Sequence, residues 1–199
     1  MLTERAKQLI PKARIVSFAN WEPIYPPATI AMFQAADEEG RYPADIDLDR
    51  LVATFETFPE QEKSAALARV GAVRLLRDRA EEIVTEARET LLAKYPGLTD
   101  PGGDLYPPER AKACWRDFWH FLRCITYGVA GGKTEYTSEE GLHYMELLYQ
   151  ELNVPLQAMV SGLEGLKAAS LKRLPATDPD AIAPYFDHLI RQMRRFSNS

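Results

Sequence analysis

The chain has 199 residues, of which 46% are apolar and 27% are charged, and its formal net charge is -5. This composition is typical of one globular domain and excludes a disordered chain. The negative charge gives no clustered basic surface for nucleic acid or an anionic membrane, so we exclude both partners. No apolar run approaches the ~20 residues of a bilayer span, and Met1 to Ser17 is too charged for a signal peptide. We therefore expect a cytoplasmic protein without membrane insertion.

The first 27 residues form a predicted N-terminal extension. Residues 1–10 are amphipathic and favour a short helix, which Pro11 limits. Residues 18–27 (FANWEPIYPP) contain three prolines and three aromatic side chains, which favours an extended segment laid against the domain. We expect residues 1–27 to pack on a domain that comprises residues 28–199.

The middle of the chain has helical periodicity. Residues 29–38 form a predicted helix that stops at Gly40, and residues 46–58 form a second one behind aspartate caps. Residues 60–95 are a long charged amphipathic stretch, in which Gly71 is the expected bend between two helices. Residues 96–108 contain four prolines and three glycines and are predicted to be an irregular loop.

The last part of the chain is also predicted to be helical. One helix spans residues 112–132 and breaks at two glycines, and Thr137 and Glu140 read as a capping box for a helix that ends at Leu152. Pro155 suits the first turn of a helix to about residue 174, and Asp178 is expected to start the last helix. No stretch alternates in the manner of a strand, so the predicted fold is all-α with about eight helices.

The helix over residues 112–132 carries two stripes of side chains. At ~3.6 residues per turn, one apolar face also holds a thiol and a carboxylate, and its members are Cys114, Asp117, Phe118, Phe121, Leu122 and Ile125. The second stripe is mainly cationic, with Lys112, Arg116, His120, Arg123 and Tyr127. The two cysteines, Cys114 and Cys124, are about 15 Å apart along this helix, so each is expected to be a free thiol.

The sequence is poor in enzymatic motifs. Its three histidines have no paired spacing, and the glycines after residue 127 follow a helix and lead into no phosphate-binding motif. We therefore expect no enzyme and no metal site. A thiol with a carboxylate one turn later does match an open-chain tetrapyrrole, because the thiol adds to an activated alkene and the carboxylate accepts hydrogen bonds from pyrrole N–H groups. The alternative interpretation is that Cys114 is a small core residue.

Several segments resemble one protein family. The stretch CWRDFWHFLRCITYGVAGG resembles the chromophore-attachment helix of the phycobiliproteins, and PGGDLYPPERAKAC resembles the loop before it in allophycocyanins. Further similarity lies in AADEEGRY, AKYP, ELNVPLQAMVSGLEGLK and PYFDHLI, in the family's order, from about residue 28 to residue 193. The resemblance implies a globin-like helical fold in which an N-terminal helical pair serves subunit association.

The resemblance also implies a ligand and a partner. The ligand is a linear tetrapyrrole such as phycocyanobilin, joined by a thioether to Cys114, with Asp117 on the pyrrole nitrogens and Arg116 on a propionate. Lys112, Asp104, Phe118 and Phe121 complete the expected pigment site. Asp37 and Arg123 match residues that pair across the family's subunit interface, and Tyr127 matches an interface tyrosine. These matches imply a homodimer or a heterodimer, and a component of the phycobilisome or photosystem, cytoplasmic and peripheral to the thylakoid membrane.

Departures from the family pattern leave other functions open. Asp104 replaces the family's loop asparagine, Ala113 replaces a cation, and Trp115 and Trp119 replace smaller residues, which indicates a diverged paralogue. The first alternative is a chromophore-free or transiently loaded interaction protein of the photosynthetic apparatus. The second is a heme or sensor globin that uses His143 or His120 as the axial ligand.

Overall fold

The computed structural model describes residues 2–175 and 179–197. Over these residues the chain forms nine α-helices and two single 3-10 turns, with no strand beyond one isolated bridge between Val16 and Thr137. The elements are α1 (Glu4–Leu9), η1 (Ala19–Trp21), α2 (Pro27–Glu38), α3 (Asp45–Thr54), η2 (Phe55–Thr57), α4 (Glu60–Asp78), α5 (Ala80–Lys94), α6 (Pro108–Gly131), α7 (Glu139–Glu151), α8 (Leu156–Leu171) and α9 (Pro179–Met193).

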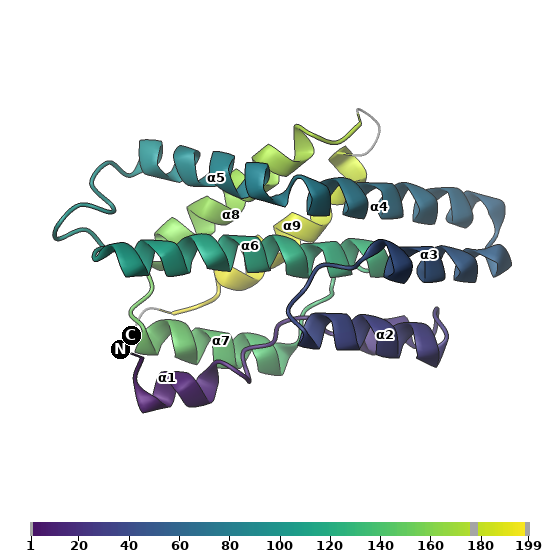
Figure 1. The fold of residues 1–199 in the computed structure, drawn as a ribbon, viewed down its shortest axis with the longest axis horizontal. Coiled ribbons are helices and arrows are strands. Elements are labelled where there is room, and N and C mark those ends of the chain that lie inside the picture. Colours follow the sequence, from purple (N-terminus) through teal and green to yellow (C-terminus); the bar gives the residue numbers. More distant parts are fainter. Residues whose placement is uncertain (1, 176–178, 198–199) are drawn as a thin grey trace.

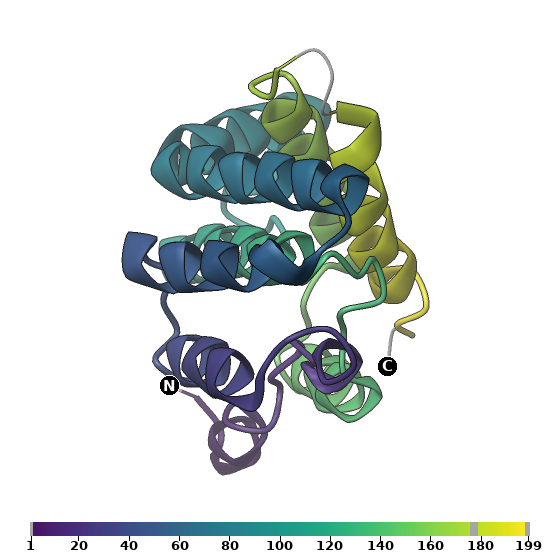
Figure 2. The same cartoon turned by 90° about the vertical axis from the view of Figure 1, so that its right-hand side faces the viewer.

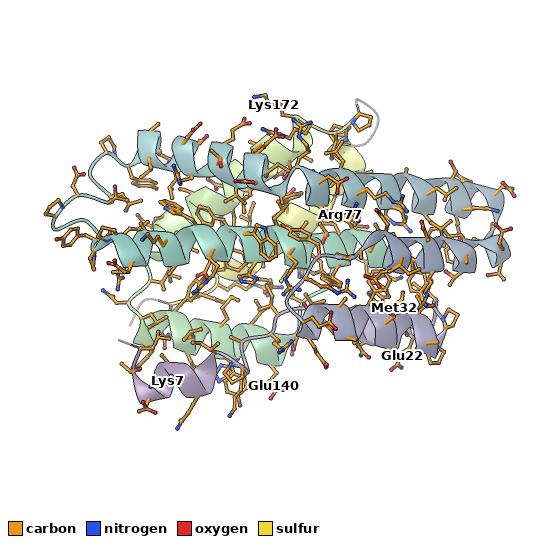
Figure 3. The ribbon with its side chains drawn as sticks, viewed as in Figure 1. Lys7, Glu22, Met32, Arg77, Glu140 and Lys172 are labelled. Carbon is orange, nitrogen blue, oxygen red and sulfur yellow. The ribbon has the colours of Figure 1, made fainter. Side chains whose placement is uncertain are left out.

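The helices are stacked in layers around α6. In Figure 1, α4 and α5 follow one another along one edge of the molecule, and α6 runs back beside them. Helices α1, α2 and α7 form a further layer on the other side of α6. Helices α8 and α9 cross behind, and the turned view in Figure 2 places them along one side of the stack. Side chains fill the space between α6 and the layer of α2 and α7 (Figure 3).

Helix α6 is the longest element, and its ends follow from local chemistry. Pro108 occupies the first turn, where a missing N–H costs nothing, so the helix begins four residues before the predicted start. Gly132 ends it in the left-handed conformation, with φ of 69°, and its N–H donates to the carbonyl of Val129. The second half of α6 is buried on every side, which places it at the centre of the core.

Two predicted helix boundaries are wrong. The stretch over residues 60–95 does not bend at Gly71, which lies inside α4 with open space around it, but breaks at Arg79, between α4 and α5. A helix interior tolerates a lone glycine at a cost of about 1 kcal/mol, so Gly71 alone does not end it. The cap of α7 is Ser138, whose hydroxyl accepts from the N–H of Gly141, whereas Thr137 bonds the ring of His188.

Two further expectations concern the ends of the chain. Residues 18–27 are not extended throughout, because Ala19–Trp21 form a 3-10 turn that folds the three aromatic side chains inward. The predicted start of the last helix, Asp178, lies outside the described residues, and α9 is described from Pro179. Among the described helices none is long and apolar enough to cross a bilayer.

Candidate functional site

The thiol and the carboxylate of α6 lie on the side of the helix that faces α7 and α8. Cys114 is 5% exposed, and its Sγ lies 3.3 Å from the Sδ of Met159 in α8. Burial, with a smaller contribution from the nearby Asp117, raises the pKa of the Cys114 thiol well above its ordinary value. Cys114 is therefore a protonated thiol at neutral pH, packed against a thioether.

Asp117 lies one turn further along α6 and contacts α7. The hydroxyl of Tyr149 donates a hydrogen bond of 3.3 Å to Asp117 Oδ2. Burial raises the pKa of Asp117 to about 6, and Arg116 and the Tyr149 hydrogen bond oppose this shift. Burial and Asp117 also hold the pKa of Tyr149 well above its usual range, so the phenol stays protonated and acts as the donor. Asp117 is half-buried, and its carboxyl group changes protonation state close to neutral pH.

Two aromatic side chains of the same face belong to the core. Phe118 is fully buried and its ring lies directly over Gly162 of α8, where an added Cβ would stand 1.9 Å from the ring. Phe121 is also buried. Gly162 therefore permits a close approach of α6 and α8 that any larger residue would prevent. By their spacing in α6, both rings lie on the same face of the helix as Cys114 and Asp117.

The remaining predicted site residues lie at the rim. Lys112 and Arg116 are exposed on α6, and Asp104 is exposed in the loop that precedes it. The backbone carbonyl of Asp104 accepts from Arg110, which also bonds the carbonyls of Leu152 and Asn153 at the end of α7. Arg110 thus connects the loop before α6 to the end of α7. Lys112 and Arg116 are exposed cations within two positions of Cys114 in the sequence of α6.

The space around this pair is filled by side chains. A small cavity beside Tyr149 holds about 40 Å³ and is also lined by Leu156 and Phe196. A larger open depression of about 780 Å³ lies at the far end of α8 from Met159, among Glu81, Glu89 and Lys172. Small-molecule sites usually occupy about 300–1,000 Å³. A ligand that bonds the Cys114 sulfur has to displace the Met159 side chain, which lies against it.

The three predicted interface residues meet within one chain. Arg123 Nη1 lies 2.5 Å from Asp37 Oδ1, and the two residues are 8% and 7% exposed. Tyr127 is fully buried and donates a hydrogen bond of 2.8 Å to the carbonyl of Arg41. The edges of Phe18 and Phe33 pack on the Tyr127 ring. The Arg123 and Tyr127 end of the cationic stripe is thus covered by α2 and the N-terminal segment, whereas Lys112 and Arg116 at its other end are exposed.

Comparisons of the sequence with known proteins show which family the chain belongs to. A family model described as "Phycobilisome protein" matches residues 31–193. The chain belongs to the phycobilisome protein family. Allophycocyanin subunit alpha-B of Nostoc sp. (strain PCC 7120) is 36% identical over 158 residues, which are 79% of this chain and 93% of that protein. The allophycocyanin alpha chain of Arthrospira platensis is 33% identical over the same shares of the two chains.

Membership in the phycobilisome protein family confirms three predictions. The resemblance is confirmed, and so is the all-α, globin-like fold, which agrees with the helices over the described residues. The third is that the chain is no enzyme, as its family consists of non-enzymatic light-harvesting proteins. The first 30 residues lie outside the matched region.

The tryptophans and histidines occupy different surroundings in this phycobilisome protein. Trp115 packs on Phe118 beneath the guanidinium of Arg88, and Trp119 packs edge-on against Tyr42. His143 is exposed, whereas His120 is half-buried beside Trp119, and burial lowers the pKa of His120. Trp115 is consequently the indole that borders the thiol site, and Trp119 belongs to the contact between α6 and the residues after α2.

Three functional neighbours were not predicted from the sequence. Met159, Tyr149 and Gly162 contact Cys114, Asp117 and Phe118 from other helices. Each lies 30 to 50 positions away along the chain, so helical spacing within α6 gives no signal for them. The small residues in the stretch SGLEG of α8 do carry a signal, because spaced glycines in a helix permit close helix packing.

Proposed function

We propose that this chain is a pigment-binding member of the phycobilisome family that holds a linear tetrapyrrole of the phycocyanobilin type through a thioether at Cys114. The observation that carries the proposal is the juxtaposition of the Cys114 thiol and the Asp117 carboxylate on the face of α6 that α7 and α8 cover. Family membership and the allophycocyanin relatives support the class of ligand. When bound, such a pigment supplies absorption of visible light.

The donor set matches the features of such a ligand. The Cys114 thiol provides the covalent tether, and the Asp117 carboxylate accepts hydrogen bonds from pyrrole N–H groups. Arg116 and Lys112 provide cations for the two propionates, Phe118 and Phe121 line the apolar wall, and Asp104 lies in the loop at the rim. Because the pKa of Asp117 is about 6, this carboxylate is mostly ionised above pH 7 and is then an acceptor only.

Attachment requires that the site opens. Met159 and Tyr149 occupy the space next to Cys114 and Asp117, and the buried thiol is protonated. Opening brings Cys114 into water, which removes the desolvation that raises its pKa and increases its thiolate fraction. Helix α7 is the element we expect to move, because it packs mainly on the short helix α1 rather than on the central helices.

The test is coexpression of the full chain with enzymes that make phycocyanobilin. The expected product is coloured, is heavier by one bilin, and fluoresces with zinc after denaturation. Cys114→Ala should lose the covalent colour, and the matched control Cys124→Ala, at the other buried thiol of α6, should keep it. A colourless wild-type product would overturn the proposal.

The second candidate function is a chromophore-free or transiently loaded interaction protein of the phycobilisome. The observation that favours it is the close packing of Cys114 against Met159, with Trp115 beside it, which leaves the thiol site filled. It predicts that the Cys114→Ala protein, expressed in cells that lack the gene, restores the wild-type phenotype in full. The pigment function predicts that the same variant fails to complement. Both candidates place the chain in the cytoplasm, at a phycobilisome peripheral to the thylakoid membrane.

A further inference from the structure

The N-terminal segment of residues 2–25 lies before the region that matches the family model, which begins at residue 31. Its helix α1 packs on α7, and Thr3 donates a hydrogen bond of 2.7 Å to Glu151 at the end of that helix. Further along, Ser17 N–H donates to the Tyr136 carbonyl at 2.7 Å, and Ser138 N–H donates to the Ile15 carbonyl at 2.8 Å. The segment is therefore joined by backbone hydrogen bonds to the connection between α6 and α7.

The aromatic side chains of this segment occupy a fitted site on the last turn of α6. Trp21 is 1% exposed, and an added Cβ on Gly131 would lie 2.4 Å from its indole. The Tyr25 hydroxyl donates to the Gly131 carbonyl at 3.4 Å, and Phe18 packs edge-on against Tyr127. The absence of a side chain at Gly131 thus lets the indole lie directly on the helix backbone.

The same aromatic residues hold α2 against α6. The Trp21 ring contacts Phe33 of α2, and Phe33 in turn packs against Tyr127 of α6. Near the other end of α2, Asp37 makes its buried ion pair with Arg123, and Arg14 of the segment bonds the carbonyls of Asp37 and Glu38. The segment therefore covers Phe33, Tyr127 and the Gly131 notch, which form one continuous apolar face. We call this the α2/α6 face.

The allophycocyanin relatives indicate what could cover the α2/α6 face in place of the N-terminal segment. Two of them are named as subunits, and their matched regions span 93% of their own length but only 79% of this chain. The extra residues of this chain include the segment that supplies Phe18, Trp21 and Tyr25. Removal of these rings would expose a contiguous apolar patch, and such patches on subunits are usually buried against another chain.

We propose that residues 2–25 take the place of a second subunit, covering the α2/α6 face within the same molecule and keeping the chain monomeric there. When the segment is displaced, a second copy of this chain covers the face instead. The driving force is burial of the same apolar area, at about 25 cal/mol per Å², which the monomer otherwise satisfies internally without loss of translational freedom. The proposal does not depend on whether a pigment is bound.

The experiment compares the self-association of full-length variants by sedimentation velocity over a range of concentrations. The wild type should sediment as a monomer throughout. The double variant Phe18→Ala/Trp21→Ala should show a concentration-dependent rise toward twice the mass of one chain. The matched control Leu2→Ala/Ile10→Ala removes side chains from the same segment that are 47% and 46% exposed, and it should remain monomeric.

Reversal by the segment itself tests specificity. A synthetic peptide of residues 1–25, added in excess to the Phe18→Ala/Trp21→Ala chain, should restore the monomer, and the same peptide with both aromatic residues replaced by alanine should not. Hydrogen exchange should show protection of residues 127–131 by either the peptide or the second copy. If excess peptide leaves the dimer intact, the segment and the second copy do not compete for the α2/α6 face, and the proposal is wrong.

A second variant guards against loss of folding. Gly131→Leu leaves the segment sequence intact and displaces the Trp21 indole from the opposite side, so it should also produce a dimer. Circular dichroism checks that each variant is folded. A folded variant of either kind that stays monomeric over the whole range would overturn the proposal, as would a wild type that dimerises in the same range.

Discussion

Asp117 is the residue through which pH acts most directly on the candidate site. Burial raises its pKa in the folded chain to about 6, against about 3.8 in an unfolded one. Between these values the folded state binds more protons than the unfolded state, so stability falls as pH rises from about 4 to about 6. The ionised carboxylate at pH 7 therefore costs about 3 kcal/mol of stability relative to the protonated one.

Asp117→Asn should remove this dependence. We expect the difference in unfolding free energy, wild type minus variant, to fall by about 2–3 kcal/mol between pH 4 and pH 7, because only the wild type must bury a charge. Urea unfolding of both proteins at each pH measures this difference in unfolding free energy. The contributions of the other titrating groups are common to both proteins and cancel. Asp104→Asn, at an exposed carboxylate, is the matched control. A difference that stays flat across this range would contradict the pKa shift.

The thiols of Cys114 and Cys124 should not react with alkylating reagents in the native protein. Burial raises the pKa of Cys124 to about 12 and that of Cys114 further, so neither forms a significant thiolate at pH 8. Iodoacetamide should label both only after denaturation, as mapped by mass spectrometry. Met159→Ala removes the side chain that covers the Cys114 sulfur and should speed labelling at Cys114 about tenfold or more, while Cys124 stays unreactive. Equal labelling of both thiols in the native variant would contradict this packing.

At the scale of single elements, spacing within α6 predicted much of the site. A period of 3.6 placed Cys114, Phe118 and Phe121 on one side, and the structure buries all three. The same spacing placed Arg123 and Tyr127 on one stripe but gave no sign that α2 and the N-terminal segment of the same chain bury them. Periodicity reports which residues share a face, but a segment more than 80 positions earlier determines that this face is covered.

The contact of α6 with α8 should depend on the match between Phe118 and Gly162. Gly162→Ala places a methyl group against the Phe118 ring and should cost about 1–3 kcal/mol through overpacking. The same change in a Phe118→Leu background should cost much less, because the smaller side chain leaves room. Chemical denaturation of the four proteins of this double-mutant cycle gives the coupling energy. Gly71→Ala, in open space within α4, is the control and should be neutral or slightly stabilising.

At the scale of the whole molecule, one buried ion pair connects α2 to the central helix α6. Asp37 and Arg123 are both buried, so removing one leaves the other charge without compensation. Asp37→Ala should destabilise the chain by about 3–5 kcal/mol. The double variant Asp37→Leu/Arg123→Met should lose much less, since no charge is left buried. Thermal and urea unfolding decide this, and additive losses in the double variant would contradict a direct pair.

The overall architecture was predictable, but the position of the N-terminal segment was not. Helix stops such as Gly132 and the proline-rich loop before α6 follow from local chemistry. The packing of Trp21 on Gly131 depends instead on two residues that lie more than 100 positions apart. No periodic pattern around either residue predicts that they are in contact. Likewise, Tyr149 and Met159 reach the thiol site only through the packing of α7 and α8.

The hydrogen bonds that hold the N-terminal segment can form only late in the synthesis of the chain. Asn20 bonds the Glu135 carbonyl, and Thr3 bonds Glu151, across separations of 115 and 148 residues. During synthesis Thr3 and Asn20 therefore leave the ribosome long before Glu151 and Glu135 have been made. Contacts of such long sequence range form slowly. A nascent chain thus displays its aromatic N-terminus and an uncovered α2 for most of its synthesis, and this is the interval in which a second chain has access to the same face.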